Sequence, residues 1–308
     1  MNAALAGVIQ IAGGVCLAPL LPGLVQTLKA RLQGRRGSSP LQPYRELLRL
    51  WGKTGVDPAG TSFVYRWAPC LCAAATLLVL PLLPIAGASP DWPLGNDALV
   101  VVGLLALTRF AITASAWDTA SGFALMGAAR DLMIAVFAEG LLLLVVVIGA
   151  LPAAGTDLVA MSAASAGGEI WGEPAHWCGA AAFALVLLVE TGRQPIDNPD
   201  THLELTMVHE GPLLEYAGRD LALLEWTMAA RHWIFFVLGA GVFLPHWGGF
   251  GVQLALLIGA LPVLAAGLAA TETTQAKLRL LRVPSLLATG ALLALVGIAS
   301  WALSGAAG

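Results

Sequence analysis

Acidic, basic and imidazole side chains gather in one segment of an otherwise apolar chain, ETGRQPIDNPDTHLELTMVHE, from Glu190 to Glu210. Carboxylates that share a site of low dielectric constant titrate as a coupled set with raised pKa values, which is the state that a proton relay requires. The two histidines, His202 and His209, are not spaced as in the HExxH pattern of zinc hydrolases. The residue types therefore favour proton transfer over metal-assisted hydrolysis.

Prolines divide this acidic segment. Pro195 and Pro199 exclude a continuous helix, and an asparagine before the second of them is typical of a turn. After the turn, Asp200 or Thr201 can cap a helix that carries Glu204 near its first turn. A simple solvated loop is one explanation of the segment, but apolar residues alternate with its acids. We therefore expect polar groups that fold back into a protein-lined cavity.

Further ionisable side chains fall within or beside apolar stretches, where each is costly unless it is paired or hydrated. Glu139 is the clearest example, about two turns into an apolar segment. A neutral glutamic acid bonded to a neighbouring helix would explain it, but we favour a proton-relay role. Arg109 is either its counter-ion or a side chain that extends to the membrane surface. The others are Glu190, Glu225, Arg231, His232 and Glu272.

The elements that hold these residues are expected to be transmembrane helices. Of the 308 residues, 58% are hydrophobic and 11% are charged, whereas roughly a quarter are charged in soluble domains. A span needs about 20 mostly apolar residues, and we expect eight spans: Ala3 to Leu28, Trp67 to Ser89, Ala98 to Trp117, Leu132 to Thr156, Pro174 to Val189, Trp226 to Pro245, Trp247 to Thr271 and Val283 to Ser304. This predicts an all-α polytopic membrane protein with a single membrane domain, residues 1–308, and excludes a soluble enzyme or nucleic-acid binder.

Charge in the connections predicts the orientation, because cytoplasmic loops are enriched in Lys and Arg. The odd-numbered connections carry the basic residues, and the even-numbered ones carry Asp91, Asp97, Asp157, Glu169 and Glu173 instead. Both termini are therefore expected outside the cytoplasm of a cell with this protein in its plasma (inner) membrane. An even number of spans is required, and eight satisfies it.

The first connection also has the spacing of an amphipathic helix. Leu47, Leu48 and Trp51 alternate with Arg45 and Arg49 at helical intervals, so a cytoplasmic helix is expected to lie in the plane of the interface. Anionic headgroups of the lipid bilayer are one partner for its basic face. Docking of a cytoplasmic protein is the other.

The cysteines do not predict a metal site. Cys70 and Cys72 are separated by one residue, not two, and Cys16 and Cys178 lie far away in the sequence. Iron–sulfur and structural zinc sites are therefore not expected in this chain.

Three separated motifs resemble one known family. They are the acidic segment from Glu190 to Glu210, ARLQGRRGSSPLQPYRELLRLWGK from Ala30 to Lys53, and AKLRLLRVP from Ala276 to Pro284. The sequence is similar to the membrane subunit shared by respiratory complex I and group 4 membrane-bound [NiFe] hydrogenases, with the formate hydrogenlyase subunit 4 branch most similar. Ile196 to Glu204 carries the likeness to the hydrogenase branch.

The resemblance implies a subunit with no active site or cofactor of its own. It would join a cytoplasmic redox arm, made of iron–sulfur and hydrogenase-like or dehydrogenase-like subunits, to antiporter-like membrane subunits. Iron–sulfur clusters and a [NiFe] centre would lie in those partners, and in complex I relatives the junction encloses a quinone. By the resemblance, junction residues are Arg35, Arg36, Glu190, Arg193, Asp197, Glu204 and Glu210. The proton path would contain Glu139, with Glu225 and Arg109 as further members.

Two other functions stay open on the sequence. A stand-alone secondary transporter usually shows internal repeats with broken helices at matching positions, and we find no convincing repeat between the two halves. A purely structural anchor for a redox module would have nearly the same sequence, so only the carboxylates at membrane depth argue against it. The electron donor and acceptor, and the choice of proton or sodium, cannot be inferred from this chain.

Overall fold

The computed structural model describes residues 3–85, 95–197, 207–246 and 248–307. Regular structure in these parts is helical, apart from an isolated bridge between Asp97 and Asp157. The prediction of an all-α polytopic membrane protein is confirmed at this level. By length and composition, six helical stretches can cross a membrane: α4 with η1 (Phe63–Leu82), α5 (Ala98–Asp118), α6 (Gly122–Ala153), α9 (Gly218–Phe243), α10 (Phe250–Thr274) and η4 with α11 (Leu280–Ser304, the helix α11 itself being Val283–Ala307).

Two further apolar segments correspond to the first and the fifth of the spans that the sequence predicts. α1 (Ala3–Leu17) and α2 (Leu20–Leu32) form a pair bent by 41°, and α8 (Pro174–Glu190) is a shorter apolar helix. The connecting elements are α3 (Gln42–Trp51), α7 (Leu158–Ala164), η2 (Gly168–Gly172) and η3 (Gly211–Leu213). The amphipathic helix expected in the first connection is present as α3, and none of its residues is buried.

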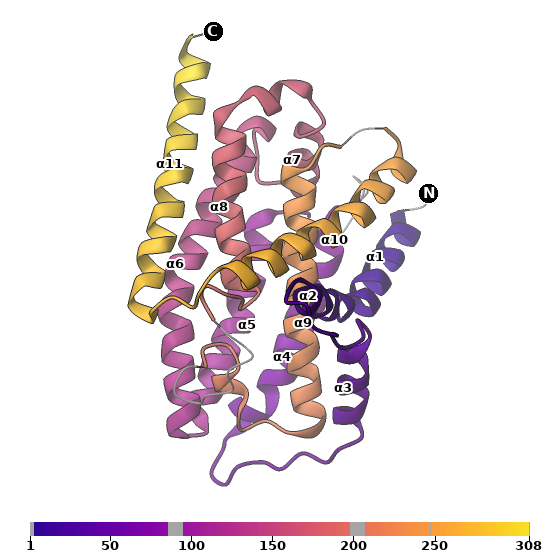
Figure 1. Ribbon diagram of the computed structural model, residues 1–308, viewed down its shortest axis with the longest axis vertical. Coiled ribbons are helices and arrows are strands. Elements are labelled where there is room, and N and C mark those ends of the chain that lie inside the picture. Colours follow the sequence, from indigo (N-terminus) through magenta and orange to yellow (C-terminus); the bar gives the residue numbers. More distant parts are fainter. Residues whose placement is uncertain (1–2, 86–94, 198–206, 247, 308) are drawn as a thin grey trace.

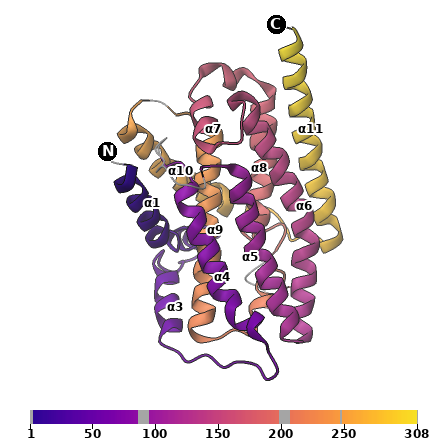
Figure 2. The same ribbon diagram turned by 180° about the vertical axis from the view of Figure 1, so that it is seen from behind.

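The helices form a bundle around α9. In the apolar window of α9, 67% of the residues are buried, against 22% for α10 and α11. α4, α5, α6, α8 and α11 run alongside, whereas α10 crosses the bundle obliquely (Figure 1). Seen from behind, α4 and α5 cover α9, and α3 and α7 lie at opposite ends (Figure 2). We call these the α3 end and the α7 end.

Two helices begin earlier than the spans that the sequence predicts within them. The span expected from Trp226 begins at Gly218, so it includes charged residues that we had assigned to a loop. The span expected from Leu132 begins at Gly122, which places Glu139 near the middle of α6 instead of two turns from its start. The added residues include polar groups with different surroundings: Asp131 is buried and contacts Arg109, whereas Arg219 and Glu225 are exposed.

The first predicted span is broken at Pro19, which cannot donate a backbone hydrogen bond. Side chains from elsewhere satisfy the carbonyl groups that precede the break. Trp226 Nε1 donates to Val15 O at 3.2 Å, and the Tyr44 hydroxyl donates to Cys16 O. The break is therefore stabilised by α9 and α3 instead of by the helix itself.

Candidate functional site

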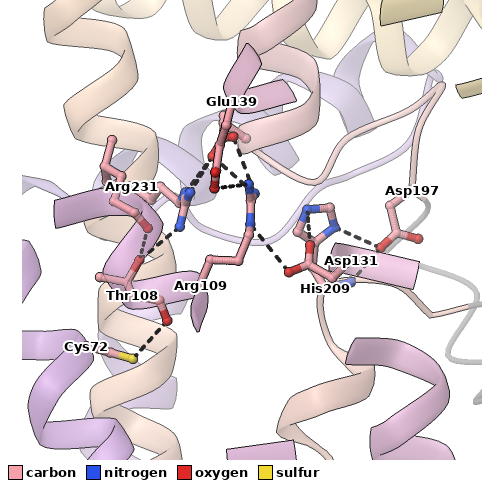
Figure 3. Close-up of polar contacts among 10 residues, drawn as sticks. Cys72, Thr108, Arg109, Asp131, Glu139, Asp197, His209 and Arg231 are labelled. Carbon is pink, nitrogen blue, oxygen red and sulfur yellow. Dashed lines mark hydrogen bonds and ion pairs between the residues drawn. The ribbon is translucent and has the colours of Figure 1, made fainter. Parts of the chain in front are cut away.

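A buried arginine lies at the centre of the site. Arg109 of α5 is 5% exposed. Its Nη1 lies 3.4 Å from Glu139 Oε1, its Nη2 3.3 Å from Glu190 Oε1, and its Nε 3.4 Å from Asp131 Oδ2. The guanidinium has donors on all three nitrogens, so one arginine can hold carboxylates from both α6 and α8 (Figure 3). Of the two expectations for Arg109, the structure supports the counter-ion.

A second arginine completes the network from α9. Arg231 donates from Nε to Glu190 Oε2 at 2.7 Å, with Nη2 at 2.6 Å from the same oxygen, and from Nη1 to Thr108 Oγ1 at 3.2 Å. Two arginines thus meet three carboxylates, Asp131, Glu139 and Glu190. With all five groups ionised, this network carries one excess negative charge. A cluster of this kind can bind one proton on a carboxylate and still keep two carboxylates to balance the two arginines.

A histidine and an aspartate of the acidic segment form a second unit. Asp197 Oδ2 accepts hydrogen bonds from the backbone N–H groups of Val208 and His209 and contacts His209 Nδ1, each at 3.2 Å. Lys277 Nζ lies 3.2 Å from Asp197 Oδ1. Burial raises the pKa of Asp197, but the hydrogen bonds and charge of His209 and the charge of Lys277 outweigh burial, so the pKa is lowered.

The pKa of His209 moves in the opposite direction. Burial lowers it, but the hydrogen bond to Asp197 and the charges of Asp131 and Asp197 outweigh burial, so the pKa is raised. Both directions favour an imidazolium next to a carboxylate.

Glycines bring this unit against α6. A Cβ atom built on Gly127 would lie 2.8 Å from the Cα of Gly211, so any side chain would force α6 and η3 apart. This close approach places the turn before η3 over Asp131. His209 Nε2 lies 3.6 Å from Asp131 Oδ1 as a result.

A cavity of about 380 Å³ with several charged residues in its lining lies at the α3 end of the bundle. Its lining comes from α2, α3, α9 and the acidic segment, and it includes Arg193, Asp197, His209, Glu210 and Glu225. A smaller cavity of about 50 Å³ lies beside the arginine network and is lined by Arg109, Asp131, Glu190 and again His209. The two cavities are neighbours, since Thr191, Gly192 and His209 of the acidic segment and Met228 and His232 of α9 line both.

A further ion-pair cluster ties the acidic segment to α2 and α10. Arg193 Nη1 lies 3.4 Å from Glu272 Oε1, and Lys29 Nζ lies 3.7 Å from Glu272 Oε2. Leu278 N donates to Pro195 O at 2.8 Å. The segment is therefore held by α10 and by the residues that follow it.

The predicted site residues fall into three groups. Arg109, Glu139 and Glu190 meet in the buried network, and Arg193, Asp197, Glu210 and Glu225 line the large cavity. Arg35 and Arg36 lie exposed between α2 and α3 and do not line it. Glu204, and the helix cap expected at Asp200 or Thr201, lie outside the residues that the structure describes.

Sequence reasoning missed part of the site. Asp131 was assigned to a loop because the span was expected to begin after it, and His209 was considered only as a zinc ligand. Arg231 stood among the polar residues at membrane depth without an assigned partner. Its position five residues into the expected span was the one available signal. In the parts of the chain that the structure describes, no three His, Cys, Asp or Glu side chains are grouped to hold a metal ion.

The fold and site define a multi-pass membrane protein with an ionisable network inside its bundle. A family model described as NADH dehydrogenase matches residues 5–302, so the chain belongs to that family. This confirms the resemblance found from the motifs.

Known relatives cover most of the chain. Formate hydrogenlyase subunit 4 of Escherichia coli is 31% identical over 281 residues, which is 86% of this chain and 87% of the relative. Hydrogenase-4 component C of the same organism is 32% identical, with 80% and 77% covered. A subunit of the NADH-quinone oxidoreductase of Cereibacter sphaeroides is 29% identical, with 73% and 74% covered.

A solved structure shares the fold. A chain of the membrane-bound sulfane sulfur reductase, an archaeal respiratory membrane complex, superposes with a TM-score of 0.84. The match covers 97% of this chain and 100% of that one at 20% identity.

Proposed function

We propose that this chain is the membrane subunit of a complex I-like or group 4 [NiFe] hydrogenase-type oxidoreductase. It joins a cytoplasmic redox arm to antiporter-like membrane subunits and couples electron transfer to translocation of protons, or of sodium. The single observation that supports this most strongly is the continuous set of charges from the large cavity to Glu139. The names of the relatives, which include formate hydrogenlyase and hydrogenase-4 subunits, support the same assignment.

In this proposal the chain crosses the plasma membrane eight times. The bent pair α1–α2 and the short helix α8 join the six longer stretches as spans, and both termini lie outside the cytoplasm. The basic residues of the connections support this orientation. The α3 end is then the cytoplasmic end.

The α3 end is the proposed junction with the redox arm. α3 presents Leu48, 75% exposed, and Trp51, 52% exposed, on a helix with no buried residue. Exposed apolar side chains of this size on one helix are typical of an interface. Electron transfer in the redox arm would change the charge next to the cavity and shift the protonation of Asp197, Glu210 and Glu225, which line it. The cavity has room for a quinone head group or for water, and any iron–sulfur or [NiFe] centre belongs to the partners.

Glu139 marks the proposed exit of the path. Its side chain is 32% exposed in the middle of α6. The surrounding surface is apolar, with Val136 at 66% and Phe137 at 45% exposure. A carboxylate in contact with lipid is costly, so an adjacent membrane subunit is expected to cover this face.

Purification in mild detergent from the organism's own membranes tests the proposal. Every co-purifying subunit would be identified by mass spectrometry. We expect iron–sulfur subunits, a hydrogenase-like or dehydrogenase-like subunit and antiporter-like subunits. Recovery of the chain alone, or as a homo-oligomer, would contradict the proposal and favour a stand-alone transporter. A redox module whose turnover moves no ions would favour a structural anchor.

A further inference from the structure

His209 lies between the two cavities of the site. It lines the large cavity together with Asp197, and it lines the small cavity together with Asp131 and Arg109. Both nitrogens of its ring face a carboxylate, Asp197 on one side and Asp131 on the other (Figure 3). The imidazole thus lies between Asp197 and the Asp131 end of the arginine network.

The contact on the Asp197 side is complete. Asp197 Oδ2 receives the backbone N–H groups of residues 208 and 209 and faces His209 Nδ1 at 3.2 Å. These contacts fix the carboxylate relative to the ring. They also assign the Nδ1 proton, because a carboxylate oxygen that accepts two backbone hydrogen bonds favours a donor at its third contact.

The contact on the Asp131 side is open. His209 Nε2 and Asp131 Oδ1 are 3.6 Å apart, which is longer than a hydrogen bond. Both atoms are buried, and neither has a hydrogen-bond partner among the described residues. Unpaired buried polar atoms are costly, so two of them facing each other favour a state in which the gap closes. A movement of less than about 1 Å is enough to form the bond.

The imidazole ring of His209 packs against Gly192. The φ of this glycine is +60°, and a Cβ atom added to it would lie 3.2 Å from His209 Nδ1 and 3.3 Å from Cγ. The imidazole therefore packs directly on the backbone at the end of α8, two residues after Glu190. A side chain at this position would press the ring away from Asp197 and Asp131.

We propose that His209 carries protons from the large cavity to Asp131, across the gap between its Nε2 and the Asp131 carboxylate. This inference rests on the proposed function. In the transfer, the Nε2–H bond of the imidazolium breaks and an O–H bond forms on Asp131. The neutral ring keeps its proton on Nδ1 and regains one at Nε2, while the gap is open, from a hydronium ion that enters from the large cavity and is left as water. One proton leaves and one enters per cycle, and the closure of the 3.6 Å gap determines when transfer occurs.

The test uses the assembled complex in inverted membrane vesicles. Reduced methyl viologen supplies electrons, loss of its colour gives the rate of electron transfer, and a fluorescent dye reports acidification of the lumen. Proton transfer by a positioned side chain contributes roughly 10²-fold or more, so His209→Ala should lower acidification per electron by at least about 10-fold. Added imidazole should restore part of it, because a free base in the vacated space can carry the proton. Acidification at the wild-type ratio in His209→Ala would overturn the inference.

A matched control separates proton transfer from packing. His176 of α8 is also buried, but its ring lies against Trp171 and Phe243, and no ion pair with a carboxylate is present among the described residues. His176→Ala with added imidazole should show the wild-type ratio of acidification to electron transfer. A loss in His209→Ala that imidazole does not restore, with an equal loss in His176→Ala, would assign His209 a structural role and overturn the inference.

The same vesicles distinguish failure of the inference from failure of the proposed function. If Glu190→Gln abolishes acidification while His209→Ala acidifies normally, the network conducts and protons reach it by another route. If wild-type turnover produces no acidification and no sodium uptake, the proposed coupling itself fails.

Discussion

The two ends of the bundle contain similar residues in different arrangements. At the α7 end, the carboxylates act locally: Asp97 accepts from Leu99 N and Asp157 accepts from Ala160 N, each at 2.8 Å, as helix N-caps. At the α3 end and in the bundle interior, Arg109 alone contacts carboxylates from two other helices. A change of protonation at an N-cap affects one helix, whereas a change of protonation in the arginine network alters the contacts of several helices. The site is therefore distinguished by how its charged residues are placed relative to one another, and not by their residue types.

The histidines show the same difference. His246 at the α7 end meets Ser165 Oγ at 2.9 Å, and burial lowers its pKa. His209 lies between two carboxylates, and its pKa is raised. The surroundings of His246 favour the uncharged ring, whereas those of His209 favour the imidazolium. Substitutions in the network, in the Asp197–His209 pair and at the α7 end are therefore expected to have different effects.

The largest effect is expected for Arg109→Met. This change leaves three carboxylates in the bundle with Arg231 as their remaining arginine partner, and breaking a buried ion pair costs about 3–5 kcal/mol. The variant should assemble poorly and lose thermal stability in detergent. Arg35→Met, at an exposed position, is the control for thermal stability and should unfold at the wild-type temperature. Equal stability of the two variants would mean that the network is hydrated and not buried.

Asp197→Asn should lower coupled turnover while the complex still assembles. The amide oxygen can still accept from the backbone N–H groups of residues 208 and 209, but the charge that favours the imidazolium is lost. Rates of electron transfer and proton uptake in vesicles provide the measurement. Unchanged proton uptake at unchanged turnover would remove the acidic segment from the mechanism.

Glu139→Gln should weaken proton translocation and leave folding intact. The side chain is 32% exposed and contacts Arg109 at one oxygen, so the neutral amide is accommodated more easily than at Glu190. Size-exclusion chromatography of the complex checks assembly, and vesicle acidification checks translocation. Wild-type acidification would show that the path leaves the bundle elsewhere.

The Asp197–His209 pair should make stability depend on pH in both directions. The pKa of Asp197 is lowered, so its contribution is present above its unfolded pKa, about 3.9, and is lost as pH falls through the folded value. The pKa of His209 is raised, so its contribution is full below about 6.5 and is lost as pH rises through the folded value. Thermal unfolding of wild type and His209→Gln should therefore differ most between these limits. A constant difference at all pH values would count against the pair.

The smallest effect is expected at the α7 end. Asp157→Ala removes an N-cap, which costs about 1 kcal/mol, and should leave proton translocation per electron unchanged. Thermal unfolding and vesicle acidification together check this. A loss of translocation here would remove the distinction between the two ends.

Much of the fold could be predicted because hydrophobic length and charge asymmetry are local in the sequence. The apolar stretches, α3 and the polar residues at membrane depth were identified in this way. The starts of α6 and α9 were not, because charged residues such as Asp131 and Arg219 interrupt the apolar pattern there, and hydropathy alone does not show that the helix continues through them. Asp131 was missed for the same reason.

The pairing of the charges also escaped prediction. Arg109 and Glu190 are 81 residues apart in the chain, and their contact depends on how α5 and α8 pack. His209 reaches Asp131 because Gly127 and Gly211 allow a close approach of backbones, and either glycine alone in the sequence is uninformative. The residue types were predictable, whereas their partners required the fold.

We propose that the buried network conducts the protons whose movement is driven by electron transfer. The most direct measurement is the number of protons translocated per electron by the assembled complex, for wild type, Glu190→Gln and Asp157→Ala. Glu190 contacts both arginines and is buried, so we predict that this ratio falls sharply in Glu190→Gln and stays at the wild-type value in Asp157→Ala. A wild-type ratio in Glu190→Gln, with the complex intact, would contradict the account.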